Sequence, residues 1–207
     1  MTRLTFTTRV LKPVGFLAAA GPGLSLLWRT FGSGDLGADP VKTLQIVTGL
    51  STIVLLLVTL AITPLRRLTG WNELIRLRRM TGVWAFGYAL AHALVYFIFD
   101  QSLDPGLIWS DTVEHPRIAV GFLAFLLLIP LAATSTDGMI RRLGRRWGLL
   151  HRLVYPAAAL GILHFLMVQK LDLRVGAGYV AVFAVLMLLR LWSRGRSGVR
   201  EAPATPR

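Results

Sequence analysis

The sequence predicts an all-α integral membrane protein, a bundle of six transmembrane helices with both termini in the cytoplasm. The 207-residue chain is 54% hydrophobic and has a mean hydropathy of +0.60. Apolar runs of roughly 18–22 residues recur along it, about the length that crosses ~30 Å of hydrocarbon as a helix. Arginines and lysines gather in alternate connections between these runs, a pattern that sets the orientation of a membrane protein.

The predicted spans follow one another with short connections. They cover residues 14–31, 44–63, 81–99, 118–134, 150–168 and 175–192. Residues 21–23, Gly-Pro-Gly, should kink the first span, and Pro64 should end the second. Residues 1–192 therefore form one transmembrane domain. The basic tail of residues 193–207 is rich in Pro, Gly and Ser, and we expect it to be disordered and cytoplasmic.

The charge pattern indicates sidedness and excludes several kinds of protein. A net charge of +13 would fit nucleic-acid binding, but the arginines lie in short loops between apolar runs. The N-terminus, the loops after the second and fourth spans and the tail are basic, which predicts cytoplasmic termini.

The chain has no cysteine, so thiolate-bound iron–sulfur clusters and covalently attached haem are excluded.

Two of the four histidines lie inside predicted spans. His92 is about twelve residues, or ~18 Å, from the cytoplasmic end of the third span, and His164 about fourteen, or ~21 Å, into the fifth. Ionisable residues within spans are candidates for function, and imidazole is a common haem ligand. Because these spans run parallel, we predict that both rings clamp one haem; the alternative is structural bonding to neighbouring helices. His115 should be exposed at the outer side.

His151 begins the fifth span on the cytoplasmic side and is a candidate ligand of an inner haem. It precedes His164 by a rise of ~20 Å, with the two side chains roughly 140° apart around a regular helix. Pro156, between them, can change that phase. Otherwise His151 is an interfacial histidine near a quinone or flavin. Arg78 and Arg79 are candidates for binding haem propionates or a flavin phosphate, or they anchor the topology.

Two other functions fit the same residues. The first is a stand-alone quinol- or metal-reducing b-type cytochrome without a dedicated protein partner. The second is a transporter or proton channel that uses His92 and His164 as a relay. The sequence places no Asp or Glu well inside a predicted span, and this argues against a proton-coupled carrier.

Three segments carry a resemblance to a known family. Residues 77–92, LRRMTGVWAFGYALAH, resemble the third helix of the MsrQ family (formerly YedZ). Residues 130–138, PLAATSTDG, and 145–155, RRWGLLHRLVY, are similar to it as well. The likeness covers residues 43–192. This family comprises haem-binding membrane subunits of periplasmic protein-methionine-sulfoxide reductase systems, within the ferric-reductase-like transmembrane superfamily.

The resemblance implies cofactors and residues that hold them. It implies one or two haem b groups and allows FMN. The implied iron ligands are His92, His164 and His151. The implied cofactor-binding set adds Arg78, Arg79 and Arg152 to these three histidines. In this superfamily two helices each bring two histidines, whereas the third span here brings only His92. The second ligand of an inner haem therefore stays open.

The resemblance also implies partners. It implies electron transfer in the bacterial inner membrane to MsrP, a periplasmic molybdenum-cofactor reductase that repairs oxidised methionine. The chain would then be the electron-transfer subunit and not the catalytic one. About fifteen residues follow Trp192, too few for a flavin or nicotinamide domain, so we expect membrane quinol or a separate cytoplasmic flavin reductase as donor. Asp100, Asp104, Asp111 and Glu114 make the outer side acidic, which predicts a partner with a basic docking patch.

Overall fold

The computed structural model describes residues 2–169 and 173–199. Every regular element in this part of the chain is a helix. Six helical stretches are long and apolar enough to cross a membrane. They are Arg3–Gly32, Pro40–Thr69, Asn72–Asp100, Pro116–Ala133, Arg145–Val168 and Arg174–Trp192. The predicted all-α bundle of six spans is confirmed, and the cytoplasmic placement of the termini stays a prediction.

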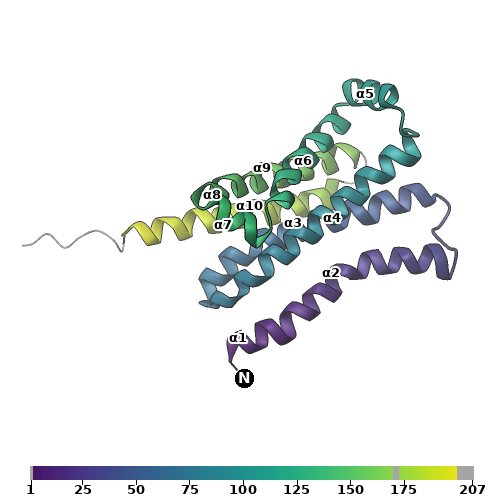
Figure 1. Ribbon diagram of the computed structural model, residues 1–207. Coiled ribbons are helices and arrows are strands. Elements are labelled where there is room, and N and C mark those ends of the chain that lie inside the picture. The colour runs from purple at the N-terminus through teal and green to yellow at the C-terminus, as the bar shows by residue number, and fades with distance from the viewer. Residues whose placement is uncertain (1, 170–172, 200–207) are drawn as a thin grey trace, which may run out of the picture.

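The first span lies at the edge of the bundle and bends along its course (Figure 1). It comprises α1 (Arg3–Phe6) and α2 (Lys12–Leu27), with π-helical turns after each. Pro22 lies inside α2. Because proline has no N–H, one backbone hydrogen bond is missing there, and the helix can bend as the sequence predicted. Tyr88 attaches this span to the bundle, because its hydroxyl donates to the Ala19 carbonyl at 2.7 Å and accepts from the Gly23 amide at 2.8 Å.

Two antiparallel helix pairs form the centre of the bundle. The first pair is α3 (Pro40–Thr69) and α4 (Ile75–Val95); the second is α6 (Pro116–Ala133) and α9 (Val154–Val168). The core between them contains Leu60, Ala85 and Ala157, each with no exposed surface. The two alanines let helix backbones approach closely, the usual means of packing within a bilayer.

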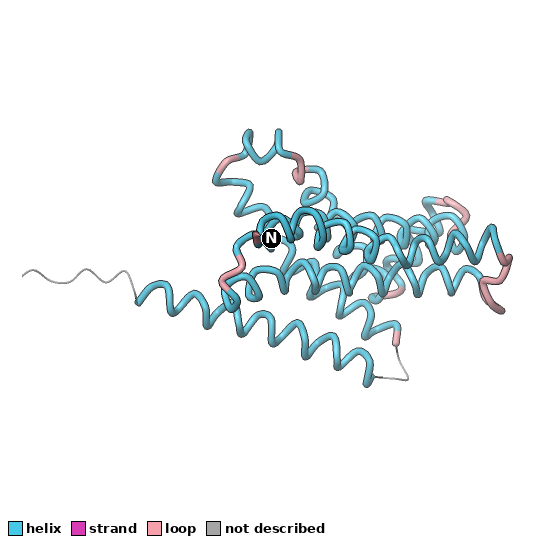
Figure 2. The backbone as a smooth tube through the Cα atoms, turned by 90° about the horizontal axis from the view of Figure 1, so that it is seen from below, coloured by secondary structure: helices cyan, strands magenta, loops and turns pink. Residues whose placement is uncertain are grey.

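The remaining helices complete the two ends. Helix α5 (Pro105–Glu114) lies between α4 and α6, and α7 (Asp137–Leu143) and α8 (Arg145–Leu150) lie between α6 and α9. Helix α10 (Leu173–Val199) packs against α3 and α9 and extends beyond the bundle at one end (Figure 2). It passes the expected end at Trp192. Residues 200–207 of the predicted tail lie outside the described residues.

The prediction that Pro64 ends the second span is wrong. Helix α3 continues through Pro64 to Thr69 and is terminated by Gly70, which has the left-handed conformation (φ 66°) that glycine favours. Proline has no N–H to offer the carbonyl one turn earlier, that of Leu60. The guanidinium of Arg190 donates to this carbonyl instead, with Nη2 and O 2.7 Å apart. A side chain from α10 thus supplies the missing hydrogen bond, and the helix persists.

The fifth span changes its winding near its cytoplasmic end. A 3₁₀ turn, His151–Leu153, separates α8 from α9, and Pro156 lies in the first turn of α9. Proline is tolerated there because the first amides of a helix have no partner within it. The tighter turn alters the phase between His151 and His164 from that of a regular helix.

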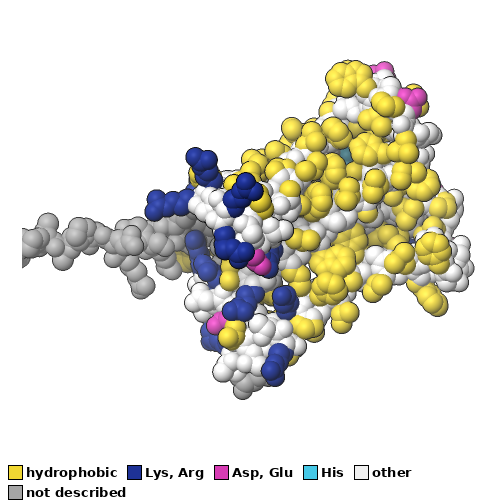
Figure 3. Space-filling model, viewed as in Figure 1, with side chains coloured by type: hydrophobic (Ala, Val, Ile, Leu, Met, Phe, Trp, Pro, Cys, Tyr) yellow, Lys and Arg dark blue, Asp and Glu magenta, His cyan; other side chains and the backbone are white. Residues whose placement is uncertain are grey.

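The surface divides into an apolar body and a basic end. Lysines and arginines gather at one end of the molecule, and apolar side chains cover much of the rest of the face shown in Figure 3. Large apolar residues point outward, among them Phe31, which is 82% exposed, and Trp28 at 70%. Such a surface is stable only when lipid covers it. The protein is therefore a multi-pass membrane protein.

Candidate functional site

His92 and His164 lie against each other inside the bundle. His92 comes from α4 and His164 from α9, and both side chains are partly buried. The centroids of their rings are 6.2 Å apart, and the ring planes are inclined by 78°. The structure thus brings together the two residues that the sequence placed at matching depth.

Each ring of this histidine pair is held by a backbone carbonyl of a neighbouring helix. Nδ1 of His92 lies 3.0 Å from the carbonyl oxygen of Gln45, and Nδ1 of His164 lies 2.7 Å from that of Arg117. A carbonyl oxygen can only accept, so Nδ1 carries the proton in each neutral ring. Nε2 then keeps its lone pair, which is the form of histidine that binds a metal ion.

Two glycines make room for these rings. Gly49 and Gly121 each follow the accepting residue by one helical turn. A Cβ atom at Gly121 would lie 2.7 Å from His164 Nδ1, and one at Gly49 would lie 3.2 Å from His92 Nδ1. Neither glycine was among the predicted site residues. The sequence offered one signal for them: the second and fourth predicted spans contain no histidine, and each contains a glycine.

The spacing of the histidine pair fits a shared iron. A metal–imidazole nitrogen bond is about 2 Å long, and a ring centroid lies about 1 Å behind its nitrogen, so two rings on opposite sides of one metal have centroids about 6 Å apart. The observed 6.2 Å agrees with that value. The inclination of 78° is compatible with it, because each ring plane can turn about the metal–nitrogen axis.

A second group of predicted residues lines a cavity of about 210 Å³ at the end of the bundle where the basic loops lie. Its wall combines four arginines with one histidine, one tyrosine and two small residues. These residues are Thr63, Arg67, Arg78, Gly148, His151, Arg152, Tyr155 and Arg190. Three of them, Arg78, His151 and Arg152, belong to the set that the sequence predicted. Four guanidinium groups around one space favour an anionic ligand.

Two polar atoms at this cavity point to a ligand. Nδ1 of His151 lies 3.2 Å from the Trp147 carbonyl, and its ring stacks on the Trp147 indole with centroids 3.9 Å apart. Nε2 of His151 and Oγ1 of Thr63 are buried and have no hydrogen-bond partner among the described residues. Buried polar atoms without a protein partner are rare and commonly meet a ligand or water.

Arg79 is directed away from this cavity, although it follows Arg78 in the sequence. It pairs with Asp137 of α7, where the two side chains are 48% and 68% exposed. The hydrogen bond and positive charge of Arg79 lower the pKa of the Asp137 carboxyl. Of the two neighbouring arginines, only Arg78 lines the cavity.

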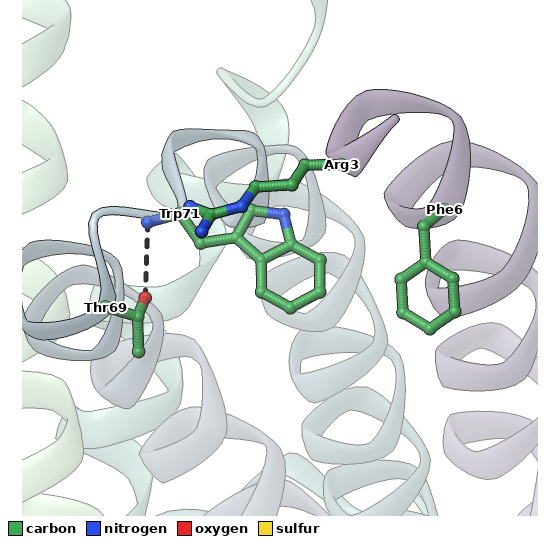
Figure 4. A pocket seen from close by; sticks show the side chains of 4 residues that line it. All are labelled: Arg3, Phe6, Thr69 and Trp71. Atoms are coloured by element: carbon green, nitrogen blue, oxygen red, sulfur yellow. Dashed lines mark hydrogen bonds between the residues drawn. The ribbon is translucent and has the colours of Figure 1, made fainter. Parts of the chain in front are cut away.

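Another cavity, of about 320 Å³, lies where α1 meets the turn between α3 and α4 (Figure 4). Arg3, Phe6, Thr69 and Trp71 line it. The Trp71 amide donates to Thr69 Oγ1 at 3.2 Å, and the Trp71 indole donates to Thr7 Oγ1 at 3.0 Å. The indole bond to Thr7 fastens the first span to the bundle, and none of the predicted site residues lines this cavity.

At the other end of the bundle, Asp111 connects α5 to the helices that carry or hold the histidine pair. Its carboxylate accepts from the Tyr96 hydroxyl at 2.6 Å and from the Gln101 side chain at 2.9 Å. Nδ1 of His115 lies 2.7 Å from the same carboxylate, and the His115 side chain is 42% exposed. Tyr96 follows α4 directly, and His115 directly precedes α6. Asp111 of α5 is thereby tied to the end of α4, the helix of His92, and to the start of α6.

The fold and its comparisons define the class of protein. Residues 47–162 match the family described as the ferric reductase like transmembrane component. The helical bundle with two membrane-embedded histidines is thus a member of this class.

Similar full-length proteins place the chain within the class. It is 49% identical over 182 residues to the protein-methionine-sulfoxide reductase heme-binding subunit MsrQ of Xanthomonas campestris pv. campestris strain 8004, covering 85% of this chain and 84% of the relative. It is 48% identical to MsrQ of Ralstonia nicotianae, covering 89% and 86%. It is 44% identical to MsrQ of Xanthomonas oryzae pv. oryzae strain MAFF 311018, covering 100% of both. The chain belongs to the MsrQ family.

Proposed function

We propose that the chain carries electrons across the bacterial inner membrane through haem b held between His92 and His164. The acceptor is a periplasmic methionine sulfoxide reductase of the MsrP type, and the donor is membrane quinol or a separate cytoplasmic flavin reductase. The observation that carries this proposal is the histidine pair, with ring centroids 6.2 Å apart and both Nδ1 atoms turned to carbonyls. The name of the relatives, heme-binding subunit, supports it.

The protein's own groups prepare the site for a metal. Haem b, when bound, supplies reversible one-electron chemistry at its iron. The carbonyls of Gln45 and Arg117 hold each imidazole in one tautomer and one orientation, and such outer partners strengthen the nitrogen that faces a metal. Because the rings are packed against Gly49 and Gly121, they have little freedom to rotate. A fixed ligand pair needs little rearrangement when the charge on the metal changes.

The inner cavity is the proposed entry point for electrons. Arg78, Arg152 and His151 face a space with two further arginines, and no second imidazole is among the described residues that line it. This composition fits the phosphate of FMN better than a second haem with two histidine ligands. It also favours an anionic group over a neutral quinol.

The proposed orientation places the basic end in the cytoplasm and α5 in the periplasm. The arginine-rich end in Figure 3 then faces the cytoplasm, as the positive-inside rule requires. The acidic residues near α5, together with Asp100, form the side on which a partner with a basic patch docks. Electrons leave from the histidine pair next to that surface.

A visible spectrum of the detergent-purified protein tests the haem assignment. We expect a dithionite-reduced b-type band that is lost in His92→Ala and in His164→Ala. His115→Ala is the matched control and should keep the band, because His115 contacts Asp111 at the surface. A colourless wild type from haem-replete cells, or a full band in both single variants, would overturn the assignment. The colourless result would favour the histidine-relay transporter.

A further inference from the structure

Arg190 is a charged residue within the sixth span, where an unpaired guanidinium would be costly. Only 8% of its surface is exposed. It donates through Nη2 to the Leu60 carbonyl at 2.7 Å and through Nη1 to the Tyr155 hydroxyl. Its guanidinium carbon also lies 5.0 Å from the centroid of the Tyr155 ring. Arg190 of α10 is therefore held by α3 and α9 together.

Pro64 creates the acceptor that holds Arg190. In a regular helix the amide of residue 64 would bond the carbonyl of Leu60, but proline has no N–H. A backbone carbonyl left unpaired within a membrane protein is strongly destabilising unless another donor reaches it. The Arg190 guanidinium is that donor. Pro64 and Arg190 thus form a matched pair on two helices.

The same guanidinium lines the inner cavity with Arg67, Arg78 and Arg152. Two of its nitrogens are engaged by groups on other helices, so its position is set before any ligand arrives. A cation that is fixed in advance binds an anion more tightly, because less side-chain freedom is lost. His151 and Thr63, whose buried Nε2 and Oγ1 atoms have no hydrogen-bond partner among the described residues, line the same cavity.

We propose that Arg190 binds the anionic group of a redox cofactor in the inner cavity, and that Pro64 positions Arg190 by leaving the Leu60 carbonyl free. The anionic group is the phosphate of a flavin nucleotide or the propionate of a haem, which share the chemistry of a negatively charged oxygen. This inference rests on the proposed role of the inner cavity. It does not depend on the histidine pair.

The structural part is tested by a double-variant cycle with Pro64→Ala, Arg190→Met and the two combined. We expect Arg190→Met to lower the apparent unfolding temperature in detergent, because the Leu60 carbonyl loses its donor. The double variant should recover most of that loss, since the alanine that replaces Pro64 supplies the missing N–H. Arg78→Met, which removes a cavity arginine that does not contact this carbonyl, should gain nothing from Pro64→Ala. Equal stability of Arg190→Met and the double variant would overturn the positioning role of Pro64.

The binding part is tested on the same proteins with FMN and riboflavin as probes and with haem per protein as a second readout. We expect the wild type to prefer FMN, and both variants lacking Arg190 to lose that preference by roughly tenfold to a hundredfold. A fall in haem per protein with unchanged FMN binding assigns Arg190 to a propionate instead. If neither quantity changes in the stable double variant, the cofactor role is wrong. The reduced band of the His92–His164 haem reports separately on the proposed function.

Discussion

The histidine pair and the inner cavity hold histidine in opposite ways. At the histidine pair, two imidazoles face each other, their Nδ1 atoms are bound to carbonyls, and glycines supply the space. At the inner cavity, a single imidazole lies among four arginines, and its Nε2 has no partner among the described residues. The first arrangement depends on close packing and suits a metal between two neutral ligands. The second depends on charge and suits an anion.

The largest effect that this contrast predicts is that of a substitution at Gly121. Gly121→Ala places a Cβ 2.7 Å from His164 Nδ1, so the ring or α6 must move. Overpacking of this kind costs about 1–3 kcal/mol, and displacement of the ligand should remove most of the haem. Gly49→Ala, at 3.2 Å from His92, should cost less. Haem per protein and the unfolding temperature measure both effects.

Gly161→Ala is the control for that series, because a Cβ at Gly161 meets no atom within 4 Å. It lies on α9, the helix of His164, and should leave haem content unchanged. Equal haem content in Gly121→Ala and Gly161→Ala would show that packing does not set the histidine pair.

The second largest effect is a difference between substitutions at the neighbouring Arg78 and Arg79. Arg78→Ala removes a charge from the inner cavity and should reduce electron entry from a flavin donor by roughly tenfold or more, the value of one charge-assisted hydrogen bond. Arg79→Ala breaks only the exposed pair with Asp137 and should leave the rate near that of the wild type. Stopped-flow reduction of the b-type band by reduced flavin measures both. Similar losses in the two variants would remove the distinction between cavity and surface.

The sequence predicts the histidine pair and the inner cavity to different extents. Hydropathy determined the number of spans, because length and apolar content alone decide whether a helix crosses a bilayer. The depth of His92 and His164 was readable from the rise per residue, since both spans run the same way. The groups that contact the two rings could not be predicted, because backbone carbonyls and glycines of α3 and α6 carry no local sequence signal of a tertiary contact.

The inner cavity was predicted only in part for a similar reason. Arg78, His151 and Arg152 were predicted from position and resemblance, and all three line the same cavity in the structure. Arg79 shared their charge but turns to α7, which no spacing rule could foresee. Arg190 had a signal, a charge within an apolar span, yet its role depends on the carbonyl freed by Pro64 more than a hundred residues earlier. Pro64 was predicted to end its helix because the sequence does not show that Arg190 supplies the missing hydrogen bond.

A third, smaller effect concerns the outer surface. If partner docking uses the acidic side near α5, electron transfer to the periplasmic reductase should slow as salt rises, because the Debye length is already about 10 Å at 0.1 M. Glu114→Gln should weaken this salt dependence without altering the b-type band. Asp111 is unsuitable for this test, because it also ties α5 to Tyr96. A rate between purified partners that is indifferent to ionic strength would contradict the docking proposal.

The smallest effect is expected at the exposed pair of Arg79 and Asp137. Arg79 lowers the pKa of Asp137, so the folded state holds the ionised carboxylate more strongly than the unfolded chain does. The resulting stability is present above the ordinary pKa of aspartate and is lost as pH falls through the lowered value. Asp137→Asn should therefore differ from the wild type at neutral pH and converge with it in acid, and added salt should shrink the difference because both side chains are exposed. Unfolding temperature against pH measures this, and a difference that persists unchanged into acid would mean that Asp137 contributes through contacts that do not need its charge and not through Arg79.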